Sequence, residues 1–152
     1  MTKEIVDVEK VIREYLSGVI HMSLGTSVDG KPWVCEVHFS FDDELNIYFR
    51  STKLRRHSIE IAKNPNVAGN IVEQHGMTDK PRGVYFEGRA EILEPITETD
   101  LAYMTVSKRY DLGPDILLSE SAPSFYKITV SDFYLFDARD SSPSKKYHLQ
   151  WK

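Results

Sequence analysis

The sequence predicts a mainly β fold, a closed Greek-key barrel of six or more antiparallel strands decorated by two to three helices. Two observations support it. Short runs of residues alternate between apolar and polar side chains, and clusters rich in Gly, Pro, Asp and Asn separate them. Helical periodicity is confined to three short stretches. Closing such a sheet removes the exposed strand edges that otherwise promote aggregation.

In the first third of the chain, one helix should precede three antiparallel strands. Apolar residues recur at helical spacing over residues 8–18, which predicts an amphipathic helix. Alternation predicts strands over residues 19–27, 33–41 and 45–50. Asp29-Gly30 between the first two strands has the residue types of a tight hairpin turn.

The remaining elements follow from the same rules. A basic helix is expected from about residue 54 to 63, since proline disfavours helical geometry in the residue before it and Asn64-Pro65 follows. Thr97 and Asp100 have the spacing of a capping box for a further helix. The other predicted elements are strands over 67–73 and 83–94, a helix over 98–110, and a final hairpin of 125–130 with 133–137.

Length and composition indicate one globular domain, residues 1–152. No apolar run is long enough to span a bilayer, and the first residues lack the pattern of a secretory signal, so we expect a cytoplasmic protein that does not bind membranes. Cys35 is the only cysteine, which excludes an intrachain disulfide and a cysteine-built zinc site. We expect no metal site.

The net charge of −4 argues against nucleic acid as a partner, because its phosphate backbone recruits a basic surface. Positive charge is nevertheless concentrated locally. Four of the 19 Lys and Arg residues lie between Arg50 and Arg56, and His57 follows directly. A small anionic ligand suits this pattern better than a polyanion.

This basic segment coincides with the predicted end of a strand and the start of a helix. Free backbone N–H groups at a helix N-terminus attract anions. A phosphate could therefore be held here by side chains as well as by backbone. The candidates are the hydroxyls of Ser51 and Thr52, the guanidinium groups of Arg55 and Arg56 and the ammonium of Lys53. His57 could donate to the same phosphate or be an ordinary helix-surface histidine. The alternative for the whole segment is a solvated basic helix face.

Several motifs follow one another along the chain. They are Phe49-Arg50-Ser51-Thr52, Arg55-Arg56-His57, Pro65-Asn66-Val67-Ala68-Gly69, Arg82-Gly83-Val84-Tyr85-Phe86-Glu87-Gly88 and the following Arg89-Ala90-Glu91. In this order they resemble the FMN-binding split barrel of the pyridoxamine 5′-phosphate oxidase-like superfamily, in particular a small, poorly characterised bacterial branch. The resemblance covers roughly residues 8–110.

The resemblance implies a homodimer that binds two FMN molecules in clefts at the subunit interface. By position, Arg55 and Arg56 match the basic pair that grips the flavin phosphate. The strand holding Val37, His38 and Phe39 matches the one whose backbone runs along the isoalloxazine ring. The expected cofactor-binding residues are Val37, His38, Phe39, Phe49, Arg50, Ser51, Thr52, Lys53, Arg55, Arg56 and His57.

The sequence also departs from the oxidases of this family. Where the oxidases carry basic side chains on the strand along the flavin, this sequence has Val34 and Phe39. Where they carry a glutamine, it has Gly83. The substrate-handling Arg/His segment at the end of the oxidases is replaced by residues 145–152, whose Tyr147 and Trp151 could stack on a flavin or form an extra strand. We therefore expect no pyridoxamine 5′-phosphate oxidase activity. Deazaflavin F420, haem or no cofactor are the alternatives to FMN.

The chain contains no dinucleotide fingerprint, phosphate loop, zinc-protease motif or nucleophile elbow. Flavin chemistry requires none, because the cofactor itself carries the electrons. The function predicted is a flavin-dependent oxidoreductase acting on a small molecule, with no catalytic residue assigned. The alternative is a non-catalytic module that stores or senses flavin or haem, in which His38 could be a haem ligand rather than a hydrogen-bonded strand histidine.

Overall fold

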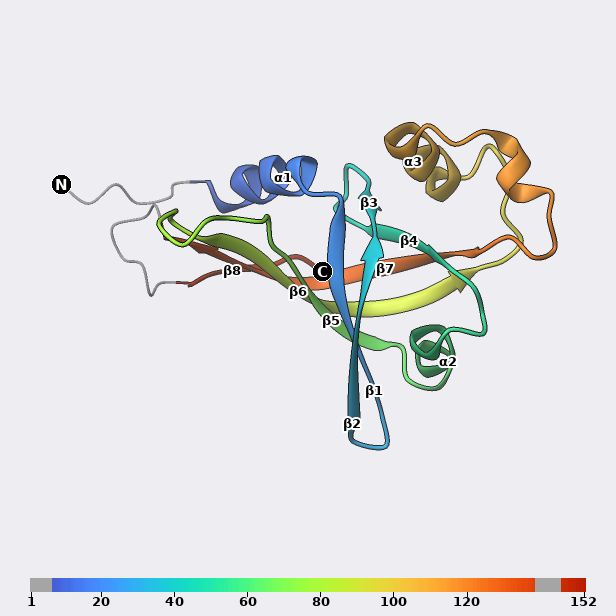
Figure 1. Cartoon of the computed structure of the whole chain (residues 1–152), viewed down its shortest axis with the longest axis horizontal. Helices are drawn as coiled ribbons and strands as arrows, with labels where there is room; N and C mark the ends of the chain where they lie inside the picture. Colours follow the sequence, from blue (N-terminus) through green and yellow to red (C-terminus); the bar gives the residue numbers. More distant parts are fainter. Residues whose placement is uncertain (1–6, 139–145) are drawn as a thin grey trace.

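One antiparallel sheet of eight strands forms the centre of the protein, in a computed structural model that describes residues 7–138 and 146–152. The strand order is β2-β1-β5-β6-β7-β4-β3, and β8 pairs with β7. The sheet curls into a split barrel with helices around it (Figure 1), which confirms the predicted mainly β barrel with helices. The strand order begins at β2 and ends at β3, so the sheet keeps two edges and is not fully closed as expected. The strands are β1 His21–Val28, β2 Lys31–His38, β3 Ser40–Phe41, β4 Ile47–Ser51, β5 Asn66–Ile71, β6 Arg82–Leu93, β7 Ser124–Asp137 and β8 Lys146–Gln150. The helices are α1 Val8–Gly18, α2 Arg56–Lys63, α3 Leu101–Tyr110 and the short 3₁₀ helix η1 Pro114–Leu117.

The hairpin of β1 and β2 extends beyond the rest of the sheet (Figure 1). Its turn uses Asp29 and Gly30, both with positive φ, 52° and 74°. Such left-handed backbone matches the twist of the flanking strands, and aspartate and glycine adopt it at low cost. The turn predicted from the sequence is therefore confirmed.

The main core lies between the long strands β6 and β7 and helix α1. Phe86 on β6 and Phe133 on β7 are fully buried, as is Ile12 on the inner face of α1. Alternate residues of each strand supply this core, as a period of two requires. No helix among the described residues is long and apolar enough to cross a membrane.

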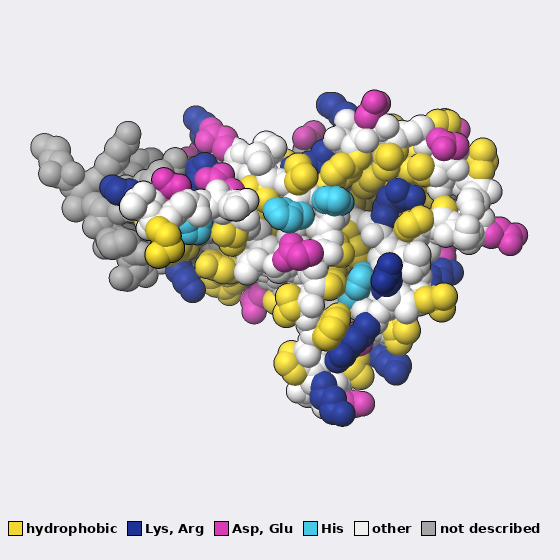
Figure 2. Space-filling model, viewed as in Figure 1, with side chains coloured by type: hydrophobic (Ala, Val, Ile, Leu, Met, Phe, Trp, Pro, Cys, Tyr) yellow, Lys and Arg dark blue, Asp and Glu magenta, His cyan; other side chains and the backbone are white. Residues whose placement is uncertain are grey.

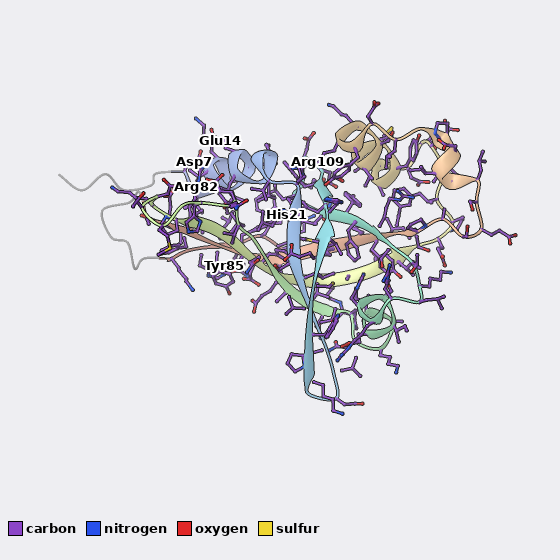
Figure 3. All side chains as sticks on the ribbon, in the orientation of Figure 1. Asp7, Glu14, His21, Arg82, Tyr85 and Arg109 are labelled. Atoms are coloured by element: carbon purple, nitrogen blue, oxygen red, sulfur yellow. The ribbon has the colours of Figure 1, made fainter. Side chains whose placement is uncertain are left out.

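Helix α3 packs on a second, smaller core around Tyr48 and Phe125. Its C-terminal end is attached to distant backbone by two side chains. Arg109 donates to the carbonyl oxygens of Leu16 and Val19, and its guanidinium lies near the end of α1 (Figure 3). The Tyr110 hydroxyl hydrogen-bonds to the carbonyls of Ile20 and Phe39. These bonds fix α3 beside the strands that carry the candidate site.

The predicted final hairpin is wrong, because residues 124–137 form the single long strand β7. The interruption read as a turn is a bulge, at which the pairing of β6 with β7 shifts between Glu87 and Gly88. Ser131, the extra residue, turns its carbonyl toward the N–H of Trp151.

Helix α3 also begins later than predicted. Asp100 is its N-cap residue, but the Asp100 carboxylate accepts from Thr97 instead of capping the helix.

The C-terminal residues 146–150 form strand β8, which selects one of the two interpretations left open by the sequence. Tyr147, Leu149 and Trp151 pack against the main core, and the Trp151 indole donates to the carbonyl of Glu44 over 2.7 Å. These aromatic side chains therefore belong to the packing of the chain's own core. Lys145 lies outside the described residues.

Candidate functional site

A cavity of about 790 Å³ lies between β2, β4, the N-terminal end of α2 and the C-terminal end of α3. Figure 2 shows Lys and Arg side chains gathered next to the β1–β2 hairpin, with a histidine among them. The cavity brings together most of the residues singled out from the sequence. These are Val37, His38, Phe49, Arg50, Ser51, Thr52, Arg55, Arg56 and His57.

Two of the predicted residues do not line this cavity. Phe39 is 1% exposed and packs in the core, where the Arg109 guanidinium lies 4.7 Å from its ring centre. Lys53 forms an ion pair with Glu94 and lines a different cavity, on the other side of α2. The chain turns between Thr52 and Arg55, so that consecutive basic side chains point to different places.

Helix α2 begins at the cavity without any cap of its own. Arg55 is the N-cap residue, its backbone is extended, and no side chain accepts from the first N–H groups. The first turn contains no acidic residue, although helix dipoles favour negative charge there. The unpaired N–H groups and the guanidinium of Arg55 leave this end of the cavity electropositive.

Arg50 adds a second cation to the same region. Its guanidinium lies over the Phe125 ring at 5.4 Å, and burial lowers the pKa of the side chain. The Nε atom is buried and has no hydrogen-bond partner among the described residues. Leaving a buried charged donor unpaired is costly, and Arg50 is one of the residues that line the cavity, where an anionic ligand could offset its charge.

Arg56 is engaged differently from Arg50 and Arg55. Its Nε donates to the Glu60 carboxylate over 2.9 Å, and its guanidinium stacks on the Trp33 ring at 4.2 Å. Glu60 is almost buried, at 6% exposure. This carboxylate offsets the charge of Arg56 and ties α2 to the β1–β2 hairpin. Among the described residues, Arg50 and Arg55 are the cations at the cavity for which no anionic partner is found.

Ser51 and His57 form a hydrogen-bonded pair in the cavity wall. The Ser51 Oγ to His57 Nε2 distance is 2.7 Å, and the Ser58 hydroxyl donates to Ser51 Oγ over 3.0 Å. Burial lowers the pKa of His57, and the neighbouring Arg55 charge lowers it further. The imidazole is therefore held in its neutral form near pH 7.

The opposite wall of the cavity is apolar and aromatic. This wall is formed by Val106 and Tyr110 of α3 and by Leu112, which follows the helix. The half-exposed Trp33 lies at its edge. The cavity thus combines a cationic corner with a wide apolar surface, which suits a planar ring system that carries an anionic tail.

Sequence reasoning missed the contributions of Trp33, Cys35 and α3. Trp33 and Cys35 share one face of β2 with Val37, so the period of two along this strand could have placed them in the site. Nothing in the local sequence of α3 indicates the site, because α3 reaches it through contacts far apart in the chain. Within the described residues, no group of three or more His, Cys, Asp or Glu side chains is arranged to hold a metal ion.

A family model described as pyridoxamine 5′-phosphate oxidase matches residues 8–133 of this chain. The chain belongs to this family. The matched region contains every element of the cavity, from β2 through α2 to α3. No curated protein sequence matches the chain significantly.

Solved structures with the same fold include proteins of differing description. A FAD-binding protein from Mesorhizobium loti is 22% identical with a TM-score of 0.64, covering 82% of this chain and 88% of that one. HutZ, the haem storage protein from Vibrio cholerae, is 17% identical with a TM-score of 0.66, covering 82% and 91%. A conserved hypothetical protein from Mycobacterium tuberculosis is 20% identical with a TM-score of 0.70, covering 91% of both. At these identities the similarity establishes the fold.

Proposed function

We propose that the cavity binds FMN and that the protein is a flavin-dependent oxidoreductase of a small molecule. The unpaired, buried Nε of Arg50 is the observation that carries this proposal. Arg50 lines the same cavity as Arg55 and the uncapped start of α2. Together these groups would hold the phosphate of FMN, and Ser51 and Thr52 would add hydroxyl contacts.

The apolar wall would receive the isoalloxazine ring. Val37 and His38 on β2 would lie along one edge of the ring, and Tyr110 and Val106 would exclude water from it. Bound flavin supplies hydride or electron transfer, and the protein contributes binding, orientation and shielding. A small planar substrate that stacks on the ring is the class expected.

A homodimer is part of the same proposal. Strand β2 is an edge of the sheet, and it carries exposed apolar side chains next to the cavity, with Val34 63% exposed and Trp33 39% exposed. Exposed apolar groups on an unpaired edge strand favour association. A second copy of the chain placed there would cover the open side of the cavity.

The first experiment is the visible absorption spectrum of the purified protein, followed by titration of the apo form with FMN and riboflavin. We expect flavin absorption bands and FMN bound at least about 100-fold more tightly than riboflavin, since charged hydrogen bonds to phosphate contribute about 1.5–3 kcal/mol each. Riboflavin lacks only the phosphate. Equal affinity for the two flavins would refute the phosphate site.

The assignment of individual residues is tested by Arg50→Met with Arg55→Ala. This double variant should lose the preference for FMN while it remains folded, because methionine preserves packing on Phe125. Lys53→Met is the matched control, since Lys53 belongs to the same basic segment but lies outside the cavity. It should bind FMN normally.

A non-catalytic module that stores or senses haem is the second candidate. His38 favours it, because this exposed imidazole lines the cavity with its ring 5.6 Å from the Tyr110 ring. A Soret band that His38→Ala abolishes would support haem. Bound FMN that neither nicotinamide cofactors nor plausible acceptors turn over would support a non-catalytic flavin module.

A further inference from the structure

Three side chains, one at the end of β4 and two in the first turn of α2, form a short chain of hydrogen bonds. The Ser58 hydroxyl donates to Ser51 Oγ over 3.0 Å, and Ser51 Oγ lies 2.7 Å from His57 Nε2. Thr52 supplies a weaker acceptor, its carbonyl, 3.3 Å from Ser51 Oγ. Ser51, His57 and Ser58 are all nearly buried, and Ser51 and His57 line the cavity.

The direction of this chain depends on the proton at His57 Nε2. A hydroxyl has one proton to donate and two lone pairs that accept. When Nε2 is bare, the Ser51 proton is used by the imidazole, and Ser51 has nothing to donate to an anion. When Nε2 carries a proton, it and Ser58 fill both lone pairs of Ser51 Oγ, and the Ser51 proton is left with the Thr52 carbonyl, a weaker acceptor that a phosphate can replace.

We propose that His57 is a positioning residue, which becomes protonated when a phosphate group binds and thereby turns the Ser51 hydroxyl toward that phosphate. This inference rests on the proposed function. The proton comes from the solvent, and no covalent bond to the ligand forms. On this proposal the neutral imidazole of the free protein carries its proton on Nδ1, which leaves Nε2 bare and the Ser51 hydroxyl directed at it.

The charges around His57 explain why an anion would shift its protonation. Burial and the Arg55 charge disfavour the imidazolium, and Glu60 favours it. From the other elements, Arg50 on β4, Cys35, Glu36 and His38 on β2, and Tyr110 on α3 face the same cavity. A phosphate beside Arg55 cancels the repulsion, so the pKa of His57 should rise on binding.

Proton uptake can be measured directly by calorimetry. FMN is titrated into the apo protein at pH 7.5 in buffers of different ionisation enthalpy, with riboflavin as the ligand that lacks phosphate. At this pH free phosphate monoesters are mostly dianions. A proton taken up on binding is therefore gained either by a group of the protein or by the phosphate once it is bound. We expect about 0.3 proton or more per FMN, and none for riboflavin.

Two variants locate the proton. His57→Gln keeps an N–H donor where Nε2 lies but cannot titrate, so it should bind FMN within about fivefold of the wild type and take up no proton. His75→Gln changes an exposed histidine outside the cavity and should preserve the uptake. No uptake in the wild type, or equal uptake in His57→Gln, overturns the inference while FMN binding stands. Failure to prefer FMN over riboflavin overturns the proposed function as well.

Discussion

Helices α1 and α2 begin in opposite ways, although both are amphipathic and both cover the sheet. At α1, the Asp7 carboxylate accepts the N–H of Lys10 over 3.0 Å, and Glu9 places a second negative charge in the first turn. At α2, the N-cap residue is Arg55, no side chain accepts from the backbone, and Arg56 adds a further cation. One helix supplies its own anion, and the other lacks one.

The difference separates a structural helix start from a binding one. An acidic N-cap stabilises a helix by about 1 kcal/mol in isolation from any ligand. A basic, uncapped start opposes the helix dipole and is stabilised only when an anion arrives. The start of α2 also lies at the cavity of about 790 Å³ that Arg50 lines, whereas no residue of α1 lines this cavity.

The largest effect is expected from Arg55→Asp, which gives α2 the type of cap that α1 has. A carboxylate at this position should accept a backbone N–H of the first turn and stabilise the apo protein by about 1 kcal/mol. It should also repel phosphate and weaken FMN binding by about 100-fold or more, because a charged contact is lost and a repulsive one is added.

Titration with FMN and thermal unfolding of the apo form test the two effects of Arg55→Asp separately. Arg55→Gln is the matched control, since it removes the cation without adding a cap. It should weaken FMN binding less and leave stability near that of the wild type. Undiminished FMN affinity in Arg55→Asp would show that α2 does not hold the phosphate.

The reverse test is Asp7→Ala, which removes the cap of α1. We expect the free energy of unfolding to fall by about 1 kcal/mol, because a backbone donor loses its acceptor. FMN affinity should not change. Glu14→Gln, which removes the same charge from an exposed position in the middle of α1 (Figure 3), is the control and should unfold like the wild type. A loss of FMN affinity in Asp7→Ala would contradict the separation of roles.

The smallest effect expected is a pH dependence of the free protein. The pKa of His57 lies below its ordinary value in the fold, so the fold favours the neutral imidazole. Its contribution to stability is complete above the unfolded pKa of about 6.5 and is lost as pH falls from there toward the folded pKa. Melting temperatures between pH 7.5 and 5.5 should therefore decline less steeply in His57→Gln than in the wild type, and saturating FMN should reduce the wild-type slope. Parallel slopes for both proteins would contradict this assignment.

Local patterns in the sequence determined much of this protein. Alternation specified the strands β1, β2 and β4, because a residue's face depends only on its place in the strand. Asp29-Gly30 specified a turn, and the succession of Ser51, Thr52 and Arg55 specified a helix start that lacks an acidic cap. Each of these features depends on backbone preferences within a few residues.

Tertiary structure decided which of these residues act together. Arg56 contacts Glu60 and Trp33, and Lys53 forms an ion pair with Glu94. Arg50 and Arg55 line the cavity. The basic residues therefore lie in three different environments, which their charge alone does not predict. The continuous strand β7 and the apolar wall from α3 likewise depend on partners far away in the chain. Pairing across a sheet and packing between elements are long-range contacts, and no local pattern encodes them.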